Sequence, residues 1–327
     1  MYTPDELHGL NAMMPAFAKA GATSLTAVDT VDVDNLADAV DRIITDGADV
    51  ISTTGSYGEV YSLLWEEFQT LVKATLDAVN KRVPVFFGVT SQNGREAVKK
   101  ARFVREVGGE GIFVGVPHYY LPTVDNAVAF YRELSELFPD LSIQVYHNPT
   151  LHRIHIPVEA FEAISQNRNI MSMKDSHRSV LEFMALQKLV KGKISIFVNQ
   201  LQYYPYVMWG AKGFWSTSAW MGPWPLVYYR DAVDAGDYAT AQEVLLDIAG
   251  GRPGGADAGE AVPQDNARKL AASHAGYCNQ GPNRSPYVVV TPESMQRASR
   301  SAERWKDLCV KYRPLVAARR RVPAGVS

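Results

Sequence analysis

The sequence is poor in cysteine and lacks the spaced ligand patterns of common metal and nucleotide sites. Its 327 residues include two cysteines, Cys278 and Cys309, which cannot form a disulfide framework and so favour a reducing compartment such as the cytoplasm. No Cys/His cluster has zinc spacing, and there is neither a phosphate-binding glycine-rich loop nor an Asp-rich calcium loop. We therefore expect no metal site and no bound nucleotide.

Strong net charge and long apolar runs are missing as well. The formal net charge is −2, which gives no electrostatic basis for binding nucleic acid or an anionic membrane. No apolar run approaches the length of a membrane span, and the N-terminus lacks the regions of a signal peptide. With 46% hydrophobic and 21% charged residues, the composition is typical of a globular cytoplasmic enzyme.

Segments typical of strands and of helices alternate through about 230 residues. Each strand-like segment is short and apolar, and a helix-like segment with apolar residues at helical spacing follows each one. Strict alternation favours a parallel sheet, and eight units predict a closed (β/α)8 TIM barrel in the α/β class rather than an open sheet. The predicted strands are Leu10–Met14, Ala48–Thr53, Val83–Val89, Gly111–Val116, Leu141–Tyr146, Ile170–Lys174, Ile194–Val198 and Lys212–Ser216.

The alternation ends near Gly236. Helix-like segments continue beyond it without strands between them. The sequence therefore predicts a catalytic barrel over residues 1–236 and a C-terminal helical extension over residues 237–327.

Lys174 is the residue that points most directly to chemistry. It ends the apolar run Ile170–Lys174, so an amine is expected at the end of a buried strand. Burial lowers the pKa of a lysine, which leaves part of it as the neutral amine that attacks a ketone. Tyr146 ends the preceding strand in the same way. An amine and a phenol on neighbouring strand ends are the parts of a Schiff-base enzyme.

Polar and aromatic residues also follow the other strands. Active sites of such barrels lie at the carboxyl ends of the strands, so these residues are expected to converge with Lys174. Fixed carboxylates are few among them, which suits an anionic ketone better than a sugar or a metal ion. They include Ser56 and Tyr57 in a turn bracketed by two glycines, His118 and Tyr119, His147 and Asn148, and Ser216.

These motifs together resemble the pyruvate-dependent class I aldolase superfamily, which includes dihydrodipicolinate synthase and N-acetylneuraminate lyase. The shared motifs are Gly55-x-x-Gly58-Glu59, Tyr146 and Lys174-Asp175-Ser176, in the expected order. The resemblance covers nearly the whole chain. It implies a lyase that binds pyruvate through a Schiff base on Lys174, with Tyr146 as the proton shuttle, no cofactor, and a homotetramer.

A narrower resemblance is to the hydratase-aldolases of polycyclic aromatic catabolism. The residues 213–223, with Trp215, Ser216 and Trp220, and the segment Gly281–Tyr287 carry it. These enzymes cleave trans-o-hydroxybenzylidenepyruvate, or its o-carboxy relative, to an aromatic aldehyde and pyruvate. Three features depart from their pattern. The motif Lys174-Asp175-Ser176 is closer to that of the synthases and lyases, His147 stands where a small residue is expected, and Tyr119 stands where a tryptophan is expected.

The resemblance also implies which residues bind the substrate. Ser56 and the Tyr57 N–H would hold the pyruvyl carboxylate, Asn148 would position water, and Ser216 would contact substrate. Tyr119, Trp215 and Trp220 would line a pocket for an aromatic ring. Two alternatives stay open: a related aldolase, synthase or dehydratase for an aliphatic or sugar-derived 2-oxo acid, and a non-catalytic barrel that binds a 2-oxo acid.

Overall fold

A computed structural model of the protein describes residues 1–175, 177–250 and 267–321. Ser176, from the Lys174 motif, lies outside the described residues, as do 251–266 and 322–327 of the predicted extension. Tertiary contacts divide the chain into two compact units. The first contains Met1–Ala16 and Asp49–Thr217, and the second contains Phe17–Ala48 and Ser218–Ser327. The boundary predicted after residue 236 remains a prediction.

The first unit contains a closed barrel of eight parallel strands, which confirms the predicted fold class. Each strand pairs with the next in chain order, and β8 pairs with β1 in the register Asn11 to Trp215. The strands are Gly9–Met13 (β1), Val50–Thr53 (β2), Val85–Gly88 (β3), Gly111–Val114 (β4), Ser142–Tyr146 (β5), Ile170–Lys174 (β6), Ser195–Asn199 (β7) and Gly213–Ser216 (β8).

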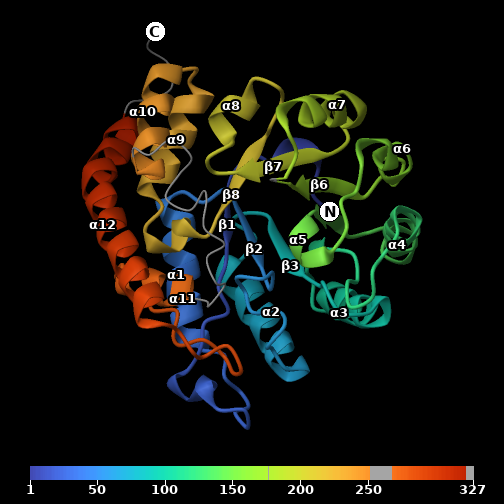
Figure 1. Ribbon diagram of the computed structural model, residues 1–327, viewed down its shortest axis with the longest axis horizontal. Coiled ribbons are helices and arrows are strands. Elements are labelled where there is room, and N and C mark those ends of the chain that lie inside the picture. The colour runs from blue at the N-terminus through green and yellow to red at the C-terminus, as the bar shows by residue number, and fades with distance from the viewer. Residues whose placement is uncertain (176, 251–266, 322–327) are drawn as a thin grey trace. The chain divides into compact units, whose positions relative to one another are not determined.

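The longer helices of the first unit lie outside the barrel wall (Figure 1). Local capping explains where several begin: Asn93 and Thr123 accept hydrogen bonds from the backbone three residues on, and Ser179 forms a capping box with Glu182. The helices are Trp65–Val79 (α2), Gly94–Glu106 (α3), Val124–Leu137 (α4), Pro149–His152 (α5), Phe161–Ile164 (α6), Val180–Val190 (α7) and Tyr203–Val207 (α8), with 3-10 turns at Pro4–Glu6 and Val158–Ala160.

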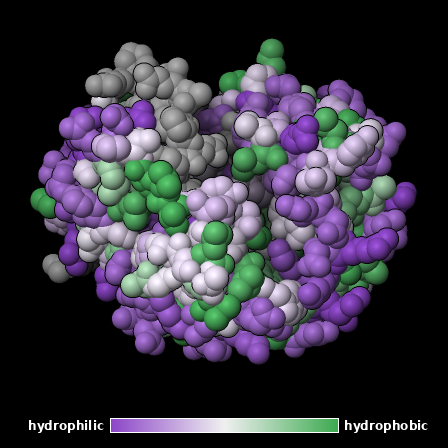
Figure 2. All heavy atoms as spheres, turned by 60° about the horizontal axis from the view of Figure 1, so that its bottom comes forward, coloured by the Kyte–Doolittle hydropathy of each residue, from purple (hydrophilic) through white to green (hydrophobic). Residues whose placement is uncertain are grey.

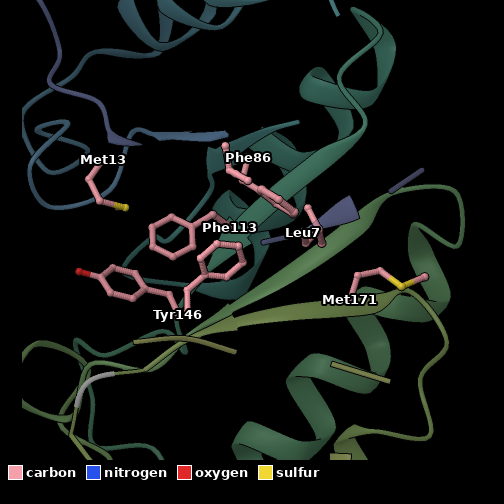
Figure 3. Packing of buried hydrophobic residues seen from close by; sticks show 8 residues of the cluster. Leu7, Met13, Phe86, Phe113, Tyr146 and Met171 are labelled. Atoms are coloured by element: carbon pink, nitrogen blue, oxygen red, sulfur yellow. The ribbon is translucent and has the colours of Figure 1, made fainter. Parts of the chain in front are cut away.

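A cluster of apolar side chains packs in the barrel, and Tyr146, the candidate catalytic tyrosine, belongs to it. The cluster, shown in Figure 3, contains Leu7, Met13, Val50, Phe86, Phe113, Tyr146, Met171 and Phe197. Tyr146 stacks on Phe113 with ring centroids 4.3 Å apart. The Tyr146 hydroxyl points away from Leu7 and Met171. The cluster therefore holds the aromatic ring rigidly while its polar end stays available.

The second unit is helical, as predicted for the C-terminal part of the chain. Within it, α9 contacts α10, and α12 contacts α9 and α11. The Trp305 indole donates a hydrogen bond to the carbonyl of Gly222 at 2.9 Å. The helices are Val33–Asp46 (α1), Trp224–Asp234 (α9), Tyr238–Ala249 (α10), Ala267–His274 (α11) and Pro292–Arg321 (α12), with 3-10 turns at Ala20–Thr23 and Ser218–Met221.

Two residues of the segment Gly281–Tyr287 pack inside this second unit. A Cβ on Gly281 would lie 1.9 Å from the carbonyl oxygen of Ala18. Arg284 is 2% exposed and donates from Nε to the Thr30 hydroxyl at 2.7 Å and from Nη2 to the Phe17 carbonyl. The close approach of the Ala18 backbone explains the glycine at position 281. The hydrogen bonds of the buried guanidinium explain the arginine at position 284.

The described surface mixes hydrophilic residues with small hydrophobic patches, as one face shows in Figure 2. Leu25, Tyr120 and Leu181 are among the exposed large hydrophobic side chains. Scattered apolar residues of this kind are normal on folded proteins. None of the helices within the described residues is long and apolar enough to cross a membrane.

Candidate active site

Lys174 lies at the end of β6 with 4% of its surface exposed. Its Nζ atom is 3.7 Å from the ring centroid of Trp215 and 4.5 Å from that of Tyr146. Burial lowers the pKa of Lys174 to about 7, against a smaller raising effect of Asp175. A ring face attracts an ammonium ion, but here desolvation outweighs that attraction. At neutral pH, Lys174 therefore carries a large fraction of nucleophilic amine.

Tyr146, at the end of β5, is the register partner of Lys174 on β6. Its hydroxyl oxygen lies 3.1 Å from Ser56 Oγ and accepts a longer hydrogen bond from Asn148 Nδ2 at 3.4 Å. Burial raises the pKa of Tyr146, while the bonds from Ser56 and Asn148 lower it. The phenol therefore stays protonated at neutral pH, and two neighbours are placed to stabilise a transient phenolate.

A tight turn after β2 brings Ser56 to Tyr146. Thr54 has a left-handed backbone with φ 51°, and its hydroxyl donates to the carbonyl of Gly88 at 2.9 Å. A Cβ on Gly88 would lie 2.2 Å from the Thr54 carbonyl oxygen, and one on Gly58 would lie 2.6 Å from the Thr54 nitrogen. Both positions require glycine for this turn to form. Tyr57 lies half-buried in the same turn.

The segment after β5 places Asn148 and His152 beside Tyr146. Asn148 caps α5, since its Oδ1 accepts the Leu151 N–H at 3.2 Å. The His152 ring meets the Tyr146 ring edge-on with centroids 4.7 Å apart. A Cβ on Gly115 would lie 2.1 Å from His152, so glycine makes the space for this imidazole. Burial, then the charges of neighbours, lowers the pKa of His152 to about 3, and the ring is neutral.

Strand β8 supplies Trp215 and Ser216. The Trp215 indole N–H is buried and has no hydrogen-bond partner among the described residues. Its register partner on β1, Asn11, is fully buried with its amide atoms equally unpartnered within that part of the chain. The Ser216 hydroxyl donates to Gln200 Oε1. The Trp215 ring beside Lys174 therefore carries a hydrogen-bond donor that no described residue uses.

Two predicted aromatic residues lie outside this group. Tyr119 is 77% exposed, and its carbonyl accepts a long hydrogen bond from Arg153 at 3.4 Å. Trp220 belongs to the second unit, where it is fully buried and meets Phe17 edge-on with ring centroids 5.8 Å apart. Contact of either residue with a substrate remains a prediction.

Sequence reasoning missed several polar residues in the barrel and in the loops after its strands. His152, Asn11 and Gln200 were not singled out, although Asn11 is a polar residue inside an apolar strand and so carried a visible signal. His118 was noted, and its ring lies 5.6 Å from that of His152. Its Nδ1 atom is buried with no hydrogen-bond partner among the described residues.

One group of side chains has the composition of a metal site. Ligand atoms of His147, Asp175 and His177 all lie within 4.8 Å of one another. The hydrogen bonds of His147 and Asp175, however, occupy both ring nitrogens and both carboxylate oxygens. A metal ion would have to break these bonds, so the group fits a hydrogen-bonded network better than a metal centre.

Comparisons with known proteins identify relatives of this chain among the aldolase-type lyases. A trans-o-hydroxybenzylidenepyruvate hydratase-aldolase from Sphingobium xenophagum is 27% identical over 93% of this chain and 95% of its own length. A trans-2'-carboxybenzalpyruvate hydratase-aldolase from Nocardioides sp. (strain KP7) is 28% identical over 95% and 96%. The structure of PhdJ bound to a substrate intermediate superposes with a TM-score of 0.87 at 29% identity, covering 95% of this chain and 99% of that one.

The chain belongs to the dihydrodipicolinate synthetase family, whose model matches residues 13–249. This match confirms the family resemblance, and it makes the protein a lyase.

Proposed function

We propose that the protein is a Schiff-base hydratase-aldolase that cleaves an ortho-substituted benzylidenepyruvate to an aromatic aldehyde and pyruvate. The observation that carries this proposal is the buried Lys174 amine, with a pKa of about 7, between the rings of Trp215 and Tyr146. A lysine of this kind attacks a ketone at neutral pH, and the adjoining rings offer an apolar surface to a conjugated aromatic substrate.

The reaction begins at the C2 ketone. The neutral Lys174 amine adds to C2, and loss of water leaves an iminium ion that withdraws electrons from the conjugated double bond. Water then adds at C4, and the resulting enamine takes a proton at C3. Removal of the C4 hydroxyl proton breaks the C3–C4 bond, which releases the aldehyde and leaves the enamine of pyruvate. Protonation and hydrolysis of that enamine release pyruvate and free Lys174.

Tyr146 is the proton carrier in this scheme. Its raised pKa keeps it an acid, so it can donate a proton to the carbinolamine oxygen. When the proton leaves, the hydroxyl of Ser56 and the amide of Asn148 stabilise the phenolate. The neutral His152 ring against Tyr146 adds no charge to this exchange.

The substrate lies between two kinds of surface. Ser56 and the Tyr57 N–H hold the pyruvyl carboxylate, and Asn148 orients the attacking water. Trp215 contacts the aromatic ring, and Ser216 contacts the carbon chain. Roles for Tyr119 and Trp220 in binding the ring stay predictions from the sequence. The unpartnered Nδ1 of His118 is a candidate for binding the ortho hydroxyl or carboxyl group.

The proposal includes the setting of the enzyme. The iminium ion formed on Lys174 is the electron-withdrawing group, so this carbon chemistry uses no metal or organic cofactor. We infer a cytoplasmic homotetramer that acts in the catabolism of polycyclic aromatic compounds. The aromatic substrates in the names of the relatives support an aromatic catabolic role. A related aldolase for aliphatic or sugar-derived 2-oxo acids is the alternative, and it would favour a more polar surface than Trp215 provides beside the amine.

Two measurements test the function. Pyruvate with borohydride should give a stable adduct on Lys174, located by peptide mass spectrometry, and Lys174→Ala should abolish it. The o-hydroxy and o-carboxy benzylidenepyruvates should then lose near-ultraviolet absorbance and yield pyruvate with the aldehyde.

The outcomes separate the candidates. An adduct without turnover of either compound would move the substrate to the aliphatic class. An adduct that persists in Lys174→Ala would refute the assignment of the nucleophile, and no adduct at all would favour a binding protein.

A further inference from the structure

Each of the two proposed catalytic residues is followed in the chain by a buried polar residue, and the side chains of these two polar residues are hydrogen-bonded to each other. His147 comes after Tyr146, and Asp175 comes after Lys174. The His147 N–H donates to the Lys174 carbonyl at 3.1 Å, and His147 Nδ1 lies 3.1 Å from Asp175 Oδ1. Their side chains are 1% and 2% exposed. The ends of β5 and β6 are therefore joined by backbone and by side chains just beyond the reacting groups.

The hydrogen bonds of His147 define its tautomer. The Ile156 N–H donates to His147 Nε2 at 3.2 Å, so that nitrogen carries the lone pair. The proton is consequently on Nδ1, from which it is donated to Asp175. Both ring nitrogens of His147 are therefore occupied, and the ring connects the loop at Ile156 to the end of β6.

Asp175 is held by further donors on its other side. Arg178 Nε donates to Asp175 Oδ2 at 2.7 Å, and the His177 N–H donates to Oδ1 at 3.0 Å. Arg178 also donates from Nη2 to the Ile156 carbonyl at 2.6 Å. Burial alone would raise the pKa of Asp175, but the hydrogen bond from His147 and the charge of Arg178 help to lower it below its ordinary value. The carboxylate is thus ionised, paired and fixed in direction.

We propose that His147, Asp175 and Arg178 form a positioning strap that aligns Lys174 with Tyr146 and directs the Asp175 carboxylate toward Arg178. This inference rests on the proposed function, in which Lys174 is the nucleophile. A carboxylate released from the strap would favour the ammonium form of its chain neighbour, which cannot attack a ketone.

The other groups around the strap do not replace it. Lys174 is faced by Tyr146 from β5, Trp215 from β8 and the neutral His152 from α5. On the far side, the His155 and His177 rings pack on His147 with centroids 5.2 and 6.2 Å away, and Glu182 pairs with His155 at 3.6 Å. Arg178 is the cation in contact with Asp175 within the described residues.

Two substitutions of His147 separate the roles of its two nitrogens. In His147→Asn, the amide Nδ2 replaces Nδ1 and keeps the bond to Asp175 but loses the acceptor for Ile156. In His147→Gln, the longer side chain places its oxygen near the Nε2 position and keeps the Ile156 bond but loses Asp175. His155→Asn is the matched control, since the His155 ring packs on His147 and its side chain is 42% exposed.

The readout is the rate of the borohydride-trapped pyruvate adduct on Lys174, measured from pH 6 to 10 in the full chain. We expect His147→Gln to move the midpoint of this profile up by about one pH unit and to slow trapping at pH 7 about fivefold. We expect His147→Asn and His155→Asn to follow the unsubstituted protein. Circular dichroism and melting midpoints establish that each variant is folded.

Each other result decides against the proposal. An unchanged profile in folded His147→Gln would overturn the strap, as would a shift in His147→Asn without one in His147→Gln. If His147→Gln does not fold, Asp175→Asn takes its place. Trapping at pH 7 should then be normal because the carboxylate charge is gone, whereas turnover should be about tenfold slower because Lys174 is no longer aligned with Tyr146. Normal turnover would overturn the strap. No adduct in the unsubstituted protein would refute the proposed function, and this inference with it.

Discussion

Replacing Lys174 by methionine should stabilise the protein, because the buried amine is costly to the fold at neutral pH. The side chain is 4% exposed, and its pKa falls from 10.5 to about 7 on folding. Below pH 7 the native state must hold a buried ammonium, and between pH 7 and 10.5 the unfolded chain binds the proton more strongly. Methionine has a similar length and no charge, so it removes this cost without leaving a large cavity.

The sign and size of the effect follow from proton linkage. Because the unfolded state binds more protons between pH 7 and 10.5, the stability of the unsubstituted protein rises with pH across that window. The amine lowers the free energy of unfolding by about 4 kcal/mol at pH 7 and by about 2 kcal/mol at pH 9. The advantage of Lys174→Met should therefore shrink by about 2 kcal/mol between these two pH values.

Urea unfolding followed by circular dichroism at pH 7, 8 and 9 measures this difference. Lys191→Met is the control, since Lys191 is exposed at the end of α7 and its removal changes charge without altering the barrel interior. Any packing gained by the methionine adds the same amount to the free energy of unfolding at every pH. An advantage of Lys174→Met that stays the same from pH 7 to 9 would refute the reasoning that burial lowers the pKa of Lys174.

Three further substitutions test the site. Tyr146→Phe keeps the ring stack on Phe113 but removes the hydroxyl. Turnover of a benzylidenepyruvate should therefore fall about 10² to 10⁴-fold, with little change in the melting midpoint. Near-normal turnover would contradict the role of Tyr146 as proton carrier. Ser56→Ala removes a bond that lowers the pKa of Tyr146, so the alkaline limb of the turnover profile should move to higher pH, and movement to lower pH would contradict it. Gly115→Ala brings a Cβ to 2.1 Å from His152 and should destabilise the fold in urea by about 1–3 kcal/mol, whereas Gly21→Ala, with nothing within 4 Å of its Cβ, is the control expected to be near neutral.

The pairing of His147 with Asp175 shows where sequence reasoning stopped. Both residues were visible as polar neighbours of Tyr146 and Lys174, and His147 was noted as a departure from the hydratase-aldolase pattern. Nothing in their spacing of 28 positions indicates a hydrogen bond, and Ile156 and Arg178 complete the network from other segments. Such contacts depend on loop paths and rotamers, which no local pattern determines.

The eightfold alternation of strands and helices, and the positions of Lys174 and Tyr146 at the ends of neighbouring strands, could be predicted from the sequence. These features follow from local hydrophobic periodicity and from the rule that parallel strands bring their carboxyl ends together. Only the tertiary structure decided that Gly115 makes room for His152, that Tyr119 is exposed, and that Trp220 packs in the second unit. Those outcomes depend on contacts between residues far apart in the chain, because close packing is settled by the shapes of all neighbours at once.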